Sequence, residues 1–176
     1  KKVSVAILGS TGYVGLELVK ILSKHPNVKI VFLGTENSPN KSINKFDQSI
    51  ENKNIPLTKL NKNFDYSKAD TVFLALPHGV SHKYVKLYYD KIQIIDLSAD
   101  FRLNNFEVYK KNYGDSHSCS ELLNNFIYGL AEFNKKQLLN HNNIAVPGCY
   151  PTSILIPSIP LIRKKLIKTS NIIIDS

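Results

Sequence analysis

A glycine-rich turn near the start of the chain separates a short apolar run from an amphipathic stretch. Val3–Leu8 is almost wholly apolar, which is typical of a strand buried on both faces of a parallel sheet. The turn that follows, Gly9–Gly15, reads GSTGYVG. Apolar residues then recur at helical spacing until Pro26, which cannot continue a helix, and a second apolar run covers Val28–Leu33. Residues 1–33 therefore predict one βαβ unit with a right-handed crossover.

The rest of the chain alternates apolar runs of strand length with segments of helical spacing. Further strands are expected at Thr71–Leu76, Gln93–Leu97 and Asn143–Val146. The other expected elements are helices at 80–88 and 133–139, loops over 34–68, and a final strand at Asn171–Ser176. An apolar segment at 153–166 contains Pro157 and Pro160, which interrupt the hydrogen bonding of any helix there. This alternation predicts an α/β fold of Rossmann type with a mostly parallel sheet.

The glycines of the first turn have the spacing Gly9-x-x-Gly12-x-x-Gly15. Glycine lets the backbone approach a pyrophosphate closely, and the following helix supplies free N–H groups and the positive end of its dipole. A glycine turn that binds nothing is the alternative, but the flanking strand and helix favour a dinucleotide site. The residues expected to contact the cofactor here are Gly9, Ser10, Thr11, Gly12, Tyr13, Val14 and Gly15.

The residues after the second expected strand should select the nucleotide. Glu36 lies about 20 positions past Gly15, where an acidic side chain binds the ribose hydroxyls of NAD. Ser38 and Lys41 follow it, and the 2′-phosphate of NADP prefers such hydroxyl and cationic partners. A solvated loop is the alternative for all of them. The sequence favours NADP(H) without deciding between the two cofactors.

Two further motifs follow expected strands and therefore lie at carboxyl ends, where open parallel sheets bind ligands. In the first, LPHG, we expect Leu76 and Pro77 beside the cofactor, and we interpret His78 as a structural or cofactor-wall residue rather than a base. In the second, DLSADFR, Arg102 offers a planar fork that suits a phosphate. A surface ion pair between Arg102 and Asp100 is the alternative.

The chain has two cysteines, and only Cys149 has a setting that favours chemistry. It lies in the motif PGCYPT after an expected strand, and Pro151 suits the first turn of a helix. The positive end of a helix dipole favours a thiolate, which can attack a carbonyl or an acyl phosphate. A buried, inert cysteine is the alternative. Cys119 lies in a polar stretch and is interpreted as incidental, and the pair has no metal-ligand spacing, so no metal is expected.

Composition and charge narrow the classes of partner. The formal net charge is +9, but the lysines are scattered among asparagines rather than gathered in one stripe, which argues against a nucleic-acid partner. The apolar runs are strand-sized and far shorter than the ~20 residues of a membrane span. Because no signal-peptide pattern is present either, we expect a cytoplasmic protein with reduced thiols.

Taken together, four motifs resemble N-acetyl-γ-glutamyl-phosphate reductases. They are GSTGYVG at 9–15, LPHG at 76–79, DLSADFRL at 96–103 and PGCYPT at 147–152. The resemblance runs across the whole chain, and the last two motifs are its specific part. Three positions depart from the family pattern: Val146 replaces a frequent asparagine, Ala131 replaces a proline, and Pro157 is unusual after the cysteine.

The resemblance implies an enzyme of arginine biosynthesis that reduces N-acetyl-L-glutamyl 5-phosphate to the 5-semialdehyde with NADPH and releases inorganic phosphate. It implies that Cys149 forms a thioester, that Ser98 and Arg102 bind the substrate, and that the cofactor ligands beyond the glycine turn are Ser38, Lys41, Leu76 and Pro77. It also implies an NADP-binding domain over 1–148, the beginning of an α+β catalytic and dimerisation domain over 149–176, and a homo-oligomer at full length. The family's catalytic histidine is expected outside this chain.

Three other functions stay open at this point. The first is an acyl-phosphate reductase like aspartate-semialdehyde dehydrogenase. The second is a related reductase that acts on a carrier-bound aminoadipyl phosphate. The third is a fragment that binds NADP and does no chemistry, which would leave Cys149 without a catalytic role.

Overall fold

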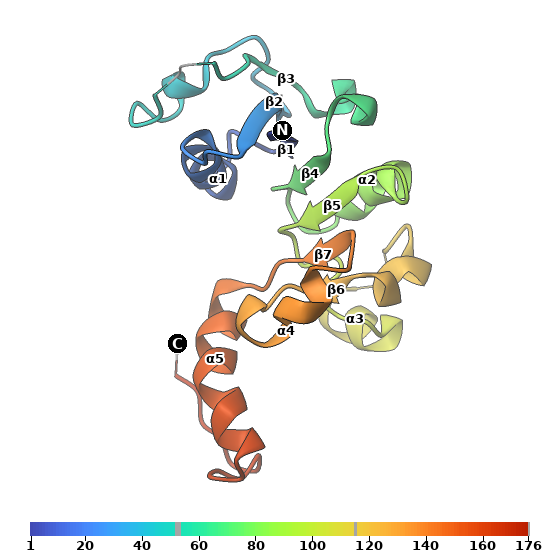
Figure 1. The fold of residues 1–176 in the computed structure, drawn as a ribbon. Coiled ribbons are helices and arrows are strands. Elements are labelled where there is room, and N and C mark those ends of the chain that lie inside the picture. Colours follow the sequence, from blue (N-terminus) through green and yellow to red (C-terminus); the bar gives the residue numbers. More distant parts are fainter. Residues whose placement is uncertain (52–53, 115, 176) are drawn as a thin grey trace.

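The computed structural model describes residues 1–51, 54–114 and 116–175, and these residues form one seven-stranded sheet (Figure 1). The strands are β1 (Val3–Leu8), β2 (Val28–Thr35), β3 (Thr58–Leu60), β4 (Thr71–Leu74), β5 (Gln93–Asp96), β6 (Ile127–Tyr128) and β7 (Asn143–Ala145). Their order in the sheet is β3-β2-β1-β4-β5-β7-β6, and each pair of neighbours is parallel. The predicted α/β fold of Rossmann type with a parallel sheet is confirmed.

The helices are α1 (Tyr13–Ser23), α2 (Ser81–Tyr88), α3 (Phe106–Tyr113), α4 (Ala131–Leu138) and α5 (Cys149–Arg163). The two faces of the sheet are covered by different helices. On one face, Val5 and Ile7 of β1 share a core with Val19 of α1. On the other, Leu8 of β1 shares a core with Val85 of α2. Because alternate residues of β1 face two different cores, the strand reads as a continuous apolar run rather than an alternating one.

The order in which the strands are added to the sheet reverses at β1. The chain passes from β1 through β2 to β3 at one edge and then returns to place β4 on the other side of β1. In open parallel sheets, ligands bind beyond the carboxyl ends of the strands at such a reversal. The loops that follow β1 and β4 therefore flank the expected cofactor crevice.

Up to residue 146, the expected strands and helices match the structure, with limits that differ by two residues at most. Strands β3 and β6 and helix α3 were not predicted from the sequence. The start of α3 does carry a signal, because the side chain of Asn105 accepts a hydrogen bond from the backbone N–H of Val108 at 3.1 Å. By contrast, β3 and β6 are only three and two residues long, so no periodicity can identify them.

The end of the chain differs from expectation. Although Pro157 and Pro160 remove two backbone donors, helix α5 continues through both to Arg163 and leads away from the sheet (Figure 1). The predicted final strand is wrong for residues 171–175, which contain a turn and irregular backbone, while Ser176 lies outside the described residues. A strand needs a neighbour to satisfy its backbone groups, and Ile173 is 94% exposed. The assignment of 149–176 to a second domain stays a prediction.

Candidate active site

A cavity of about 970 Å³ lies at the carboxyl ends of β1, β2 and β4. Its walls come from the glycine turn, from the segments after β2 and β3, and from the β4–α2 connection. Most of the residues predicted to bind a cofactor line it: Gly9, Thr11, Gly12, Tyr13, Val14, Leu76 and Pro77. Its size and position suit one dinucleotide.

The glycine turn has a backbone that other residues cannot adopt without strain. Gly9 has a φ of +81°, and a Cβ built there would lie 2.1 Å from the carbonyl oxygen of Ala75. A Cβ on Gly15 would lie 2.2 Å from the carbonyl oxygen of Gly9. Gly12 is the N-cap of α1 without any side-chain cap, and no acidic residue occupies the first turn. The positive end of α1 therefore faces the cavity, as a pyrophosphate requires.

Ser10 and Gly15 support the turn rather than line the cavity. Ser10 is buried, and both its N–H and its hydroxyl donate to the carbonyl oxygen of Gly34, each at 2.8 Å. Thr11 remains in the wall, and its hydroxyl lies 3.0 Å from that of Thr35. The loop is thereby tied to the end of β2, and the prediction that Ser10 and Gly15 bind cofactor directly stays untested.

Asn61 is a part of the site that the sequence analysis missed. Its side chain is buried, and its Oδ1 accepts the backbone N–H of Gly9 at 3.1 Å. Its Nδ2 lies 3.5 Å from Oε2 of Glu36, which also lines the cavity. One side chain therefore connects the glycine turn with the residue that follows β2. Asn61 is 52 residues from Gly9, and no local pattern marks it.

Ser38 and Lys41, the predicted ligands of a 2′-phosphate, are not brought into the cavity wall. Their backbones are bound to Thr58 at the start of β3 instead. The Thr58 hydroxyl donates to the carbonyl oxygen of Ser38 at 2.6 Å, and the Lys41 N–H donates to Thr58 Oγ1 at 3.0 Å. The cation that does line this end of the cavity is Lys62.

Cys149 is the first residue of α5, as the sequence predicted. Its side chain is exposed, and it is a free thiol. Gly148 is the N-cap and provides no side-chain cap, while its carbonyl oxygen accepts both the N–H and the hydroxyl of Thr152, at 3.0 and 2.8 Å. The thiol therefore lies beside N–H groups at a positive helix end, where negative charge on an attacked carbonyl oxygen is stabilised.

Arg102 connects the loop that carries this thiol to the segment after β5. Its Nε donates to the carbonyl oxygen of Val146 at 2.8 Å, and its Nη2 donates to that of Leu97 at 2.9 Å. A Cβ on Gly148 would lie 2.9 Å from its Nη1, so the guanidinium packs directly against the residue before Cys149. The predicted role of Arg102 in binding substrate phosphate is untested, and only Nη1 has no hydrogen bond in the described residues.

The alternative reading of Arg102, an ion pair with Asp100, is wrong because the carboxylate of Asp100 binds the LPHG motif. Its Oδ1 accepts the N–H of Gly79 at 2.8 Å and lies 2.7 Å from Nδ1 of His78. Its Oδ2 accepts the N–H of His82 at 3.0 Å. Asp100 is fully buried, so this contact fixes the turn that carries Leu76 and Pro77 into the cavity. His78 therefore has a structural setting.

Ser98 lies inside the same turn. It is buried, its hydroxyl donates to Oδ2 of Asp96 at 2.8 Å, and its Oγ accepts the N–H of Asp100 at 3.0 Å. The Ser98 hydroxyl thus both donates and accepts a hydrogen bond within the turn. Its predicted contact with substrate stays untested.

Asp96 provides a pH-dependent prediction. Burial raises the pKa of its carboxyl to about 6, in spite of hydrogen bonds from Ser98 that favour the charged form. Because the folded protein holds this proton to a higher pH than the unfolded chain, stability falls as the pH rises from about 4 to about 6. Relative to an Asp96→Asn variant, the unfolding free energy of the natural protein should fall by about 2–3 kcal/mol across that window. Urea titrations at pH 4 and pH 6 measure the unfolding free energies of both proteins. A difference between the two proteins that does not change with pH would contradict the raised pKa of Asp96.

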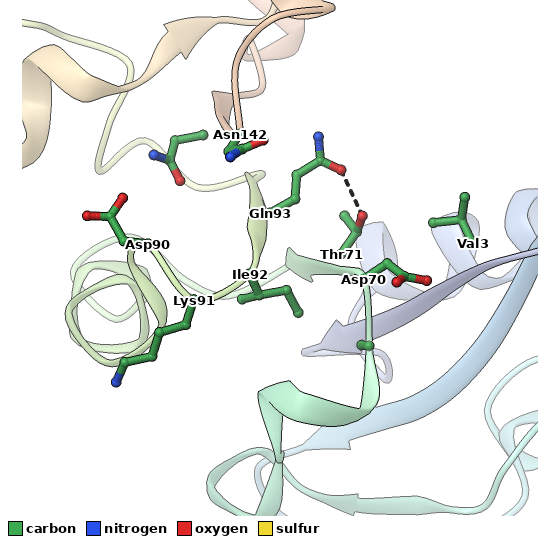
Figure 2. A pocket seen from close by; sticks show the side chains of 10 residues that line it. Val3, Asp70, Thr71, Asp90, Lys91, Ile92, Gln93 and Asn142 are labelled. Carbon is green, nitrogen blue, oxygen red and sulfur yellow. Dashed lines mark hydrogen bonds between the residues drawn. The ribbon is translucent and has the colours of Figure 1, made fainter.

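A second hollow, of about 540 Å³, lies at the opposite edge of the sheet (Figure 2). It is lined by Asp70, Lys91 and Asn142 and by the first residues of β4 and β5, where the Thr71 hydroxyl donates to Gln93 Oε1 at 2.8 Å. This is the amino edge of the parallel strands, away from the glycine turn. It is therefore not the dinucleotide site.

No helix in residues 1–51, 54–114 and 116–175 has the length and apolar character that a membrane crossing requires. Within the same ranges, no three His, Cys, Asp or Glu side chains gather in a way that could hold a metal ion.

Comparison with known proteins places this geometry in a family. The model of the semialdehyde dehydrogenase NAD-binding domain matches residues 4–141. An N-acetyl-gamma-glutamyl-phosphate reductase of Ehrlichia chaffeensis is 48% identical over 99% of the chain and 51% of its own length. The chain spans about half the length of the curated relatives it matches.

Solved structures agree on the fold. An aspartate semialdehyde dehydrogenase II of Vibrio cholerae, complexed with ASA, has a TM-score of 0.66 over 93% of this chain and 47% of its own, at 19% identity. An aspartate semialdehyde dehydrogenase of Candida albicans, solved with NADP, has a TM-score of 0.59 over 93% and 48%, at 16% identity. With its parallel sheet, its glycine turn and a family match over most of its length, the chain belongs to the semialdehyde dehydrogenase NAD-binding domain family.

Proposed function

We propose that the protein to which this chain belongs reduces N-acetyl-L-glutamyl 5-phosphate to N-acetyl-L-glutamate 5-semialdehyde, with NADPH as hydride donor and Cys149 as nucleophile. The observation that carries the proposal is an exposed thiol at the first residue of a helix, at the same sheet edge as a dinucleotide-sized cavity. The names of relatives at 36–48% identity support the substrate.

The residues of the site account for the steps of this reaction. The Cys149 thiolate attacks the acyl carbon, the bond from that carbon to the phosphate oxygen breaks, and inorganic phosphate leaves. NADPH, when bound, supplies the hydride that converts the thioester to the aldehyde. Cys149 is then released as a thiolate when its bond to carbon breaks. Throughout, the N–H groups at the start of α5 stabilise negative charge on the acyl oxygen.

Cofactor, compartment and assembly complete the proposal. The cavity holds the pyrophosphate on the glycine turn, and an NADP-bound relative of the same fold supports the choice of NADP(H). A cytoplasmic location suits two free thiols, and a homo-oligomer whose second domain begins at Cys149 follows from the family resemblance. Partners are a small acyl phosphate and inorganic phosphate, with neither nucleic acid nor membrane involved.

The reaction is tested in the reverse direction with the full-length protein. We expect NADPH to form from NADP and N-acetylglutamate semialdehyde only when phosphate is present, because phosphate must cleave the thioester. Aspartate semialdehyde is the control substrate. Phosphate-dependent turnover on aspartate semialdehyde alone would replace the proposal by the aspartate-type reductase, and binding of NADP without turnover on either would leave a binding module.

The two cysteines should differ strongly in reactivity. Cys119 is fully buried, its Sγ donates to the carbonyl oxygen of His82 at 3.3 Å, and burial raises its pKa to about 11. Cys149 is exposed at a helix N-terminus. We expect iodoacetamide at neutral pH to modify Cys149 on the order of a hundredfold faster or more. Mass spectrometry of peptides over time measures both rates, and equal, slow rates would favour the binding module.

A further inference from the structure

The hollow at the amino edge of the sheet is lined by the first residues of three neighbouring strands, and all three are polar. They are Thr71 of β4, Gln93 of β5 and Asn143 of β7. Thr71 and Gln93 satisfy each other in part, through the hydrogen bond drawn in Figure 2. The lining therefore offers hydrogen-bonding side chains to a ligand, at the edge opposite the dinucleotide cavity.

Asn143 carries a polar atom that the fold leaves unsatisfied. The residue is 8% exposed, and its Oδ1 is shielded from solvent and has no hydrogen-bond partner among the described residues. A buried acceptor without a partner costs free energy. Because the terminal torsion of an asparagine side chain is broad, this oxygen can turn toward a donor that enters the hollow. A ligand that donates a hydrogen bond here removes the cost.

The charged groups of the lining are two carboxylates and one ammonium group. Asp70 and Asp90 are exposed; one oxygen of Asp70 accepts a backbone N–H at 2.7 Å, and neither side chain forms an ion pair within the described residues. The ammonium group of Lys91 is directed away from the hollow (Figure 2), where it donates to the carbonyl oxygen of Leu87 at 2.9 Å and lies 5.3 Å from the ring centroid of Tyr66. The charge that remains for a ligand is negative.

We propose that this hollow binds a small organic cation with several N–H donors, carried by a guanidinium or ammonium group. Two carboxylates in the lining favour a cation over an anion. The unpartnered oxygen of Asn143 adds an acceptor, and guanidinium and ammonium groups donate hydrogen bonds and accept none. A volume of about 540 Å³ holds such a group together with an alkyl chain. This site is separate from the dinucleotide cavity and does not depend on the reaction proposed above.

The test measures binding of agmatine, in which an alkyl chain joins a guanidinium group to an ammonium group, to the full-length protein by isothermal titration calorimetry. Salt at about 0.15 M screens unspecific attraction between exposed charges. We expect saturable binding with a dissociation constant below about 1 mM. A bis(trimethylammonium) alkane of the same chain length should bind at least about tenfold more weakly, because it has the same charge and no N–H donor. Equal affinities, or no saturable binding of agmatine up to about 10 mM, would overturn the proposal.

Variants of the two carboxylates locate the site. Asp70→Asn keeps an oxygen that can accept the N–H of Ser4, and Asp90→Asn places a tolerant residue at a φ of +60°. Each should weaken agmatine binding about tenfold, because each removes one negative charge from the hollow. The matched control is Glu107→Gln, which removes an exposed carboxylate of α3 and should leave the affinity unchanged. An equal loss in all three variants would indicate diffuse attraction by surface charge and would reject the site.

Asn143→Val separates a role in binding from a role in folding. Valine suits the first residue of a strand, and it removes the polar atom that the fold does not satisfy. We expect agmatine to bind at least about tenfold more weakly to a protein whose melting temperature is no lower than that of the natural protein. Unchanged affinity would overturn the proposal at any melting temperature. If affinity and melting temperature both fall, Asp90→Asn decides: weaker binding supports the site, and full affinity rejects it.

Discussion

Replacing Cys149 by serine is expected to abolish reduction while leaving the affinity for the dinucleotide unchanged. A serine hydroxyl at neutral pH is a far weaker nucleophile than a thiolate, so we expect turnover to fall at least about 10³-fold. The dissociation constant of the dinucleotide should stay within a factor of about two. The reason is that the glycine turn and α2, rather than α5, line the cavity. Steady-state rates and a fluorescence titration measure the two quantities.

The matched control for this experiment is Cys119→Ser, which makes the same atomic change at a buried thiol. The serine hydroxyl can still donate to the carbonyl oxygen of His82, so the fold and turnover should be kept. A Cys149→Ser protein with near-normal turnover would remove this residue as the nucleophile. Equal loss in both variants would point to a general effect on folding.

The second large effect is expected at Gly9. An alanine there must tolerate a φ of +81° and a Cβ only 2.1 Å from the carbonyl oxygen of Ala75, which belongs to the backbone after β4 and cannot swing away. We expect Gly9→Ala to cost about 3 kcal/mol or more of unfolding free energy, since left-handed strain and overpacking add. The fraction of the Gly9→Ala protein that does fold should bind the dinucleotide poorly, because relief of the clash moves the glycine turn away from the end of α1.

Gly114 supplies the control, because its φ is +93° and a Cβ there meets no atom of the described residues within 4 Å. Gly114→Ala carries backbone strain, because a φ of +93° with a ψ of 176° is almost confined to glycine, but it adds no clash. It should therefore cost less than Gly9→Ala, about 1–2 kcal/mol. Urea unfolding gives both values. If the two glycines prove equally tolerant of alanine, the close approach between the β1 and β4 loops is not what the structure describes.

Features that depend on neighbouring residues were predictable from the sequence. The βαβ unit follows from apolar runs on either side of a glycine turn, and the position of Cys149 at a helix start follows from Pro151 two residues later. In each of these cases the deciding interactions lie within a few residues of one another. Local patterns therefore located both the cavity wall and the thiol.

Contacts between distant segments were not predictable in this way. Asn61 meets Gly9 across 52 residues, and Arg102 meets Val146 across 44. Neither pair shares a motif, and each depends on how the strands are ordered in the sheet. The error at residues 171–175 has the same origin, because apolar residues predict a strand only where a neighbouring strand can pair with them.

The two hydrogen bonds that Arg102 donates to backbone carbonyl groups restrict how the loop before α5 can shift. One guanidinium holds the backbone on both sides of the gap between the DLSADFR turn and the thiol loop, through Leu97 and Val146. Within the same turn, Asp100 holds the LPHG segment that enters the cavity wall. The loop that carries Cys149 and the LPHG segment in the cavity wall are thus both joined to the DLSADFR turn, one through Arg102 and the other through Asp100. A displacement of the Cys149 loop from the DLSADFR turn would consequently have to break the hydrogen bonds that Arg102 donates to Leu97 and Val146.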